Sequence, residues 1–165
     1  MNITNLRAGE IPGTYIVTEP VTETELMRLA KLLAKRRLAR GRKVGSPDEV
    51  HRCLQTLLMD YEHEVFGVLM LDNRHRIIQF AEMFRGTINS ASVYPREVVK
   101  EALANNAAAV ILVHNHPSGE PEPSQADRQI TDRIKLALDT VDVRVLDHVV
   151  VGHEGTVSFA ERGWV

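Results

Sequence analysis

The chain has 165 residues, of which 44% are hydrophobic and 25% are charged. This composition is typical of globular proteins, and the length suits one catalytic domain with a short extension. No apolar run approaches the roughly 18 residues of a membrane span, and the chain does not open on a charged region followed by an apolar one. We therefore expect a soluble, cytoplasmic protein that does not contact membranes. The lone Cys53 excludes an intramolecular disulfide and a cysteine-rich zinc site, so we expect it to be a small buried hydrophobe.

The net charge of −2 hides an asymmetry along the chain. Residues 1–46 carry nine Lys and Arg against four acidic residues, whereas the remainder carries an acidic excess. Six of the nine fall within nine positions: Lys35, Arg36, Arg37, Arg40, Arg42 and Lys43. Such a cluster can neutralise the phosphates of nucleic acid. The alternative is a solvated helix end, which we favour because no aromatic residues interleave with these charges to stack on bases.

Residues 1–45 are predicted to form an N-terminal arm with one basic amphipathic helix. Thr22 and Glu25 have the spacing of a capping box, and five leucines follow at near-helical intervals before Gly41. A helix this short cannot bury its own apolar stripe, so we expect it to pack on the main domain or on a second copy in a homodimer. Ser46 and Pro47 then indicate the start of another helix.

Residues 46–165 are predicted to form a single α/β domain, in which a mixed β-sheet is flanked by helices. Apolar and β-branched runs predict a hairpin and three further strands, and helical spacing separates them. The expected strands are 65–71, 76–84, 107–113, 143–151 and 156–159, and the expected helices are 95–103 and 124–138. This alternation argues for a layered α/β architecture.

The chemistry centres on His114, His116 and Asp127. Residues two apart in a strand face the same side, so both imidazoles can reach one ion while Asn115 points away. A stiff loop then delivers Asp127 on the first turn of the next helix. Two histidines and a carboxylate suit zinc with an open fourth position. The alternatives are an ordinary core or surface histidine, and for Ser124 and Asp127 a plain helix cap.

A hydrolytic site also needs a general base, and spacing alone does not choose among five candidates: Glu62, Glu64, Glu82, Glu97 and Glu101. The H-E-x-x-H and nucleobase-deaminase signatures are missing. Asp147 and His148 fall on opposite faces of a strand and are expected to be a hydrogen-bonded structural pair. The other histidines lie in polar surroundings, and we expect them to face solvent: His51, His63, His75 and His153.

His114-x-His116-Pro117 with Ser124-x-x-Asp127 resembles the JAMM signature of the MPN (JAB) metallopeptidases. The resemblance to the RadC branch covers about residues 46–165. It rests on further strings: His114 to Gly119, Arg85-Gly86-Thr87, Tyr94 to Val98 and Ser158 to Trp164. The resemblance implies the MPN/JAMM architecture, a layered fold similar to that of cytidine deaminases.

It also implies a zinc metallopeptidase that hydrolyses a peptide or isopeptide bond of an unknown protein or peptide substrate. One Zn²⁺ per chain is expected on His114, His116 and Asp127. Glu64, in Glu-x-x-Gly-x-Leu, is implied as general base, and Ser124 as the hydrogen-bond donor to the oxyanion. Longer RadC-like proteins have an N-terminal helix-hairpin-helix region, and this chain resembles a short form without it.

Two other functions stay open at this stage. One is a DNA-repair accessory protein that binds nucleic acid through the basic arm, with a structural or vestigial metal site. The other is a catalytically silent scaffold, which the complete ligand set disfavours.

Overall fold

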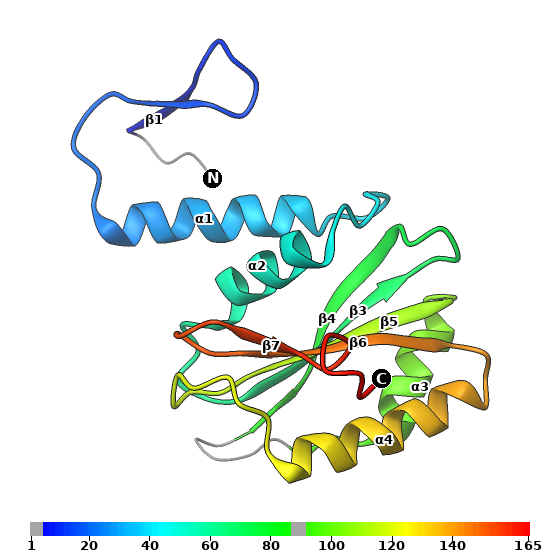
Figure 1. Ribbon diagram of the computed structural model, residues 1–165. Coiled ribbons are helices and arrows are strands. Elements are labelled where there is room, and N and C mark those ends of the chain that lie inside the picture. Colours follow the sequence, from blue (N-terminus) through cyan, green and yellow to red (C-terminus); the bar gives the residue numbers. More distant parts are fainter. Residues whose placement is uncertain (1–4, 87–91) are drawn as a thin grey trace.

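The computed structural model describes residues 5–86 and 92–165, so Thr87 of the Arg85-Gly86-Thr87 string lies outside the described residues. Five strands form one mixed sheet, and four helices cover its two faces (Figure 1). The predicted α/β fold is confirmed. The helices are α1 (Glu23–Arg37), α2 (Pro47–Leu58), α3 (Pro95–Ala104) and α4 (Gln125–Asp139). The strands of this sheet are β3 (Val65–Leu71), β4 (Ile77–Arg85), β5 (Ala109–Asn115), β6 (Arg144–Val151) and β7 (Thr156–Ser158).

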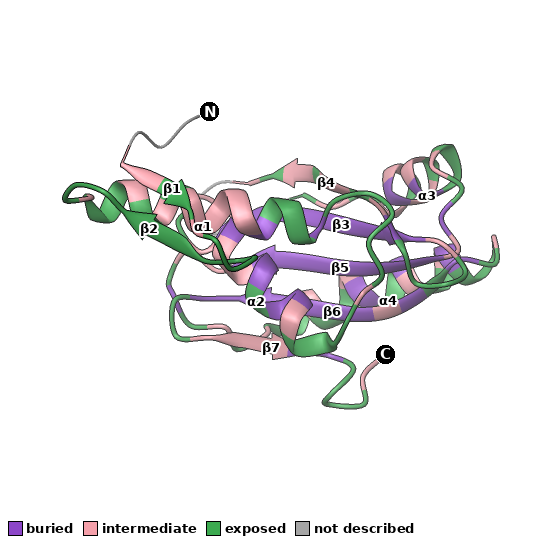
Figure 2. Cartoon of the chain, turned by 90° about the horizontal axis from the view of Figure 1, so that it is seen from above, coloured by how far each residue is buried: buried purple, intermediate pink, exposed green. Residues whose placement is uncertain are grey.

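The sheet has the order β4-β3-β5-β6-β7, in which β5 and β6 run parallel and every other pair is antiparallel. Helix α4 makes the crossover that joins the two parallel strands. Strands β3 and β5 are buried along their whole lengths, as expected for central strands covered on both faces (Figure 2). The metal motif therefore begins at the end of a rigid central strand.

Each face of the sheet buries its own hydrophobic core. On the α1 and α2 side, Ala34 and Leu54 pack with Val149 of β6. On the α3 and α4 side, Val98 and Ile134 pack with Phe66, Val68 and other side chains of the sheet. Cys53 is buried in the first core, as predicted.

The helix-start signals act as the sequence indicates. Thr22 and Glu25 form the capping box of α1, and the Ser46 side chain accepts a hydrogen bond from the Glu49 amide at the start of α2. Helix α1 ends at Arg37, ahead of Gly41, and packs on α2. None of the helices in the described ranges is long and apolar enough to cross a membrane.

The structure departs from the sequence-based expectations ahead of α1 and at His51. A short antiparallel pair, β1 (Leu6–Ala8) with β2 (Tyr15–Val17), precedes α1 and was not predicted, because its strands are short and largely exposed. The expectation that His51 faces solvent was wrong, since His51 is only 8% exposed. It lies on the buried face of α2, where a hydrogen bond with Asp147 compensates for its loss of water.

Candidate metal centre

The end of β5 and the start of α4 bring His114, His116 and Asp127 together. Nε2 of His114 lies 3.0 Å from Nε2 of His116. The two carboxylate oxygens of Asp127 complete the group, at 3.3 Å from His114 Nε2 and 3.4 Å from His116 Nε2. The three ligand atoms can therefore meet at a single point, which is the first requirement of a mononuclear site.

A chain of hydrogen bonds fixes the tautomer of His114. Thr131 donates its one hydroxyl proton to the Asp127 carbonyl at 2.5 Å, so its oxygen must accept from Nδ1–H of His148 at 2.6 Å. Nε2 of His148 then accepts from Nδ1–H of His114 at 2.8 Å. This order of donors and acceptors leaves the lone pair of His114 on Nε2, where it faces the other ligands.

His148 is fully buried and remains neutral in this chain of bonds. Burial lowers its pKa well below the ordinary value, and the neighbouring His114 lowers it further. Phe66 packs edge-on against the His148 ring with the ring centroids 5.5 Å apart, and Phe159 packs on it at 4.7 Å. The ring that supports His114 is thus held on several sides.

His116 is oriented by a backbone group. Its Nδ1 lies 2.9 Å from the carbonyl of Glu120, which can only accept, so Nδ1 carries the proton and Nε2 keeps its lone pair. The Asp127 carboxylate beside Nε2 raises the pKa of His116, because it accepts a hydrogen bond once the ring is protonated, although burial opposes this effect. Two imidazole lone pairs that face each other repel, and a cation between them removes that repulsion.

Asp127 is held as an ionised ligand. Burial favours its neutral form, but the facing imidazoles of His114 and His116 and the hydrogen bonds from Ser124 outweigh burial and hold its pKa far below the usual range. Ser124 donates both its hydroxyl and its amide to Oδ2, each at 2.7 Å, and its hydroxyl oxygen accepts from the Asp127 amide. The predicted helix cap is therefore formed. The predicted oxyanion role of Ser124 stays a prediction.

Glu64 comes directly before β3 and lies beside the ligands. Phe66 is the partner of His114 in the antiparallel ladder, and continuing that register puts Glu64 opposite His116. The charge of Glu64 contributes to the raised pKa of His116, as proximity requires. Its carbonyl accepts a hydrogen bond from the Gly86 amide at 2.8 Å. The three candidate ligands and Glu64 thus occupy one end of the sheet.

Asn115 fixes the segment that carries Glu64. Its side chain points away from the ligands, as predicted, and its Oδ1 accepts from the Val65 amide at 2.7 Å. Its Nδ2 donates to the carbonyl of His63 at 3.1 Å. Because these contacts flank Glu64 on both sides, Asn115 couples the backbone of the base to the strand that carries the histidines.

These donors fit a zinc ion. Both histidines have Nδ1 engaged and Nε2 directed inward, and the third donor is an ionised carboxylate. Three protein ligands leave a coordination position open for water or substrate, as in catalytic zinc sites.

A family model described as "RadC-like JAB domain" matches residues 44–164. The chain belongs to the RadC-like JAB family. A UPF0758 protein of Vibrio cholerae is 56% identical over 151 residues, which cover 92% of this chain and 95% of that relative. A UPF0758 protein of Shewanella baltica is 59% identical over 137 residues, covering 83% of this chain but 61% of that protein. The chain thus spans about three fifths of the Shewanella relatives.

The support that His148 gives to the candidate ligand His114 was not predicted from the sequence. Asp147 and His148 do point to opposite faces, but their side chains do not bond to each other: Asp147 accepts from His51, whereas His148 contacts His114. Strand alternation shows which face of β6 carries His148. Its approach to His114 also requires the parallel register that pairs His148 with Leu112. That register is a tertiary property.

Proposed function

We propose that this RadC-like JAB protein is a zinc-dependent metallopeptidase that hydrolyses a peptide or isopeptide bond. The observation that carries the proposal is the convergence of two imidazole Nε2 atoms and one carboxylate, with both Nδ1 atoms bonded elsewhere. Bound zinc supplies Lewis acidity, which polarises a carbonyl and lowers the pKa of water to about 7.

In this proposal Glu64 is the general base. It takes a proton from the attacking water and passes it to the leaving amine, which its place beside His116 favours. Ser124 stabilises the oxyanion through its hydroxyl, and it exchanges its bond to Asp127 for this contact. The two residues act on opposite ends of the scissile bond.

The test compares zinc-loaded parent protein with Glu64→Gln on a proteome-derived peptide library, with products read by mass spectrometry. Gln keeps the size of Glu but cannot take up the proton, and it leaves the three ligands in place. We expect cleavage by the parent and none by Glu64→Gln at equal zinc content. Equal products from both proteins, or no cleavage by the parent, overturn the proposal.

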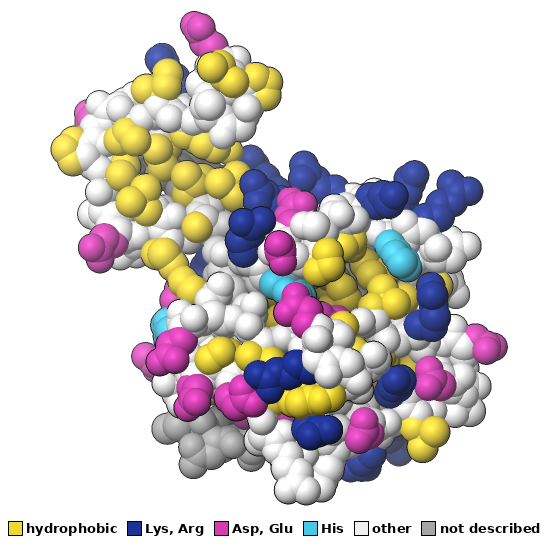
Figure 3. Space-filling model, in the orientation of Figure 1, with side chains coloured by type: hydrophobic (Ala, Val, Ile, Leu, Met, Phe, Trp, Pro, Cys, Tyr) yellow, Lys and Arg dark blue, Asp and Glu magenta, His cyan; other side chains and the backbone are white. Residues whose placement is uncertain are grey.

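A second candidate function is binding of nucleic acid through the basic residues. Lys43 forms a β-bridge with Arg76, and this bridge joins the segment after α1 to the β3–β4 hairpin. In Figure 3, Lys and Arg side chains gather along the upper edge of the molecule, over this hairpin and the end of α1. Three of the six predicted residues lie in the last turn of α1, in agreement with the helix-end interpretation: Lys35, Arg36 and Arg37.

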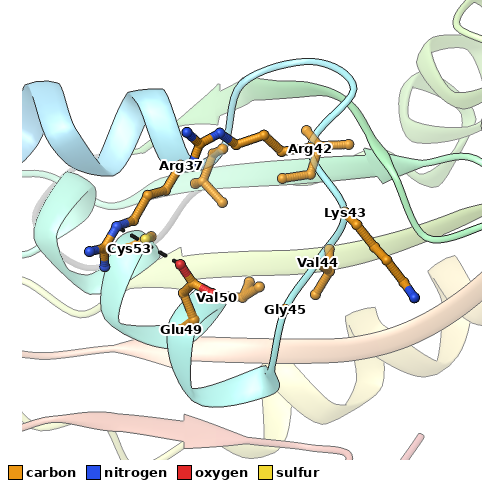
Figure 4. A pocket seen from close by; sticks show the side chains of 10 residues that line it. Arg37, Arg42, Lys43, Val44, Gly45, Glu49, Val50 and Cys53 are labelled. Carbon is orange, nitrogen blue, oxygen red and sulfur yellow. Dashed lines mark ion pairs between the residues drawn. The ribbon is translucent and has the colours of Figure 1, made fainter. Parts of the chain in front are cut away.

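A pocket of about 280 Å³ lies beneath this basic surface. Figure 4 shows Arg42 extending toward Arg37, while Lys43 points away from both. Glu49 lies 3.8 Å from Nε of Arg37 and offsets part of the positive charge. The remaining cations favour contact with a phosphate backbone over recognition of bases.

Binding to a labelled DNA duplex at several salt concentrations tests this second function. If the basic residues bind nucleic acid, the affinity for DNA falls as the salt concentration rises. The affinity is lost when four arginines are changed to Ala: Arg36, Arg37, Arg40 and Arg42. A control variant changes two arginines on α4, Arg128 and Arg133, to Ala and is expected to retain binding. Binding that is equal in both variants, or insensitive to salt, contradicts a role for the basic cluster.

A further inference from the structure

A second group of polar side chains lies on the other face of the sheet, beside a cavity of about 460 Å³. The cavity lies between the start of α2, the strand β6 and the turn after β7. Apolar side chains such as Val50 and Ile111 form part of its wall, and His51 and Glu161 contribute polar groups. Figure 3 shows an apolar hollow on this side of the molecule, flanked by histidine and acidic side chains.

His51 is the buried member of this group. Its Nε2 lies 3.0 Å from Oδ2 of Asp147. That carboxylate also accepts from the Ser158 hydroxyl at 2.8 Å and the Ala160 amide at 2.9 Å, so it is fixed in place as an acceptor. Nε2 of His51 therefore donates, and the lone pair of the neutral ring lies on Nδ1.

Nδ1 of His51 has no hydrogen-bond partner among residues 5–86 and 92–165. The residue is only 8% exposed, and what is exposed lines the cavity. Nδ1 is not among the described side-chain atoms that are both fully buried and unpartnered, so a ligand in the cavity can reach its lone pair. A carboxylate that accepts from the far nitrogen is also one of the usual supports of a metal-binding histidine.

Two carboxylates lie next to this ring. Asp48 lies three residues before His51, which puts both side chains on one face of α2. Glu161 comes from the turn after β7, where its amide bonds to Ser158. One ligand atom from each of the three residues lies within 4.8 Å of the others. Neither carboxylate forms an ion pair with a described residue. No ion-paired Lys or Arg in the described part of the chain therefore offsets the repulsion between the two negative charges.

We propose that Asp48, His51 and Glu161 form a second site for a divalent transition metal such as zinc. An imidazole nitrogen selects such a metal over Mg²⁺ or Ca²⁺, which prefer all-oxygen ligands. Both carboxylates are exposed, so the metal keeps open positions toward the cavity and solvent. The two sites lie on opposite faces of β6, where adjacent residues support them, Asp147 behind His51 and His148 behind His114.

The experiment uses the Asp127→Ala variant, in which the first site lacks a ligand. After equilibrium dialysis against micromolar zinc, bound metal is measured by plasma mass spectrometry, and Co²⁺ in place of zinc gives the visible absorption of the site. We expect about one equivalent in Asp127→Ala. Adding Asp48→Asn and Glu161→Gln removes it, and these two changes should not disturb folding because both side chains are exposed.

A matched variant controls for loss of surface charge. Asp132→Asn with Glu154→Gln, in the same Asp127→Ala background, removes two other exposed carboxylates and is expected to keep the metal. Zinc that is absent from Asp127→Ala, or that persists after the Asp48 and Glu161 changes, overturns the second site. Neither outcome affects the proposed peptidase, since these proteins all lack the first site.

Discussion

Nδ1 of His114 donates to Nε2 of His148 over 2.8 Å, and this bond turns the other nitrogen of His114 toward His116 and Asp127. We expect His148→Phe to keep the packing against Phe66 while removing the acceptor. Zinc affinity at the first site should fall on the order of 10- to 100-fold, as for other partners of ligating histidines.

This experiment is made in the Asp48→Asn/Glu161→Gln background, so that one site titrates, with a chelator competing for zinc. His148→Gln is the matched control, because its amide oxygen can still accept a hydrogen bond. A smaller loss in His148→Gln than in His148→Phe supports the positioning role. Unchanged affinity in both variants rules it out.

Asn115→Ala should destabilise the folded protein and release the backbone segment that carries Glu64. The change leaves the Val65 amide and the His63 carbonyl without their side-chain partner. A buried polar group without a hydrogen-bond partner is unfavourable, so the change should lower the free energy of unfolding by about 1–3 kcal/mol. Urea unfolding measures this cost, and zinc content should stay as in the parent because Asn115 points away from the ligands. If Asn115→Ala loses zinc as well as stability, Asn115 does not act on the Glu64 segment alone.

Gly67 is required by close packing between β3 and β4. A Cβ added there lies 2.8 Å from the ring of Phe80 and 3.3 Å from the carbonyl of Ala81. Gly67→Ala should therefore destabilise the fold by about 1–3 kcal/mol through overpacking. Phe80→Leu shortens the facing side chain, so the double variant is expected to regain part of the loss in thermal unfolding. Additive losses in the double variant argue against this contact.

Asp147 should make stability depend on pH in the acid range. Burial acts to raise its pKa, but hydrogen bonds from His51, Ala160 and Ser158 outweigh burial and leave the folded-state pKa below the ordinary value. The unfolded chain therefore takes up the proton first, near the usual pKa of about 3.9. The stabilisation is complete above about pH 5 and is lost as pH falls through the folded-state pKa.

Chemical unfolding of the parent and Asp147→Asn at several pH values measures this effect. The parent is expected to be more stable near neutral pH, with the gap closing on acidification. A gap that stays constant down to pH 3 would falsify the assignment.

Local patterns were enough to predict the main elements and to bring the three candidate ligands together. His114 and His116 are two residues apart in one strand, and Ser124 and Asp127 form one helix start, so their geometry follows from short-range rules. Glu64 was placed by resemblance, because its approach to His116 depends on the pairing of β3 with β5.

His148 and His51 were not predicted as supporting or ligating residues for a physical reason. Each acquires its role from a partner far away in the sequence, 34 residues for His148 with His114 and 96 for His51 with Asp147. Strand alternation fixes which way a side chain points but does not fix what it meets. The register of β5 with β6 and the docking of α2 supply that information.

The central claim is that His114, His116 and Asp127 hold one zinc ion. The most direct measurement is zinc content by plasma mass spectrometry on untagged protein dialysed with zinc, for the parent and Asp127→Ala side by side. Our account predicts that the variant holds one equivalent less than the parent. Equal zinc in the two proteins contradicts it, because the metal would then be bound without Asp127.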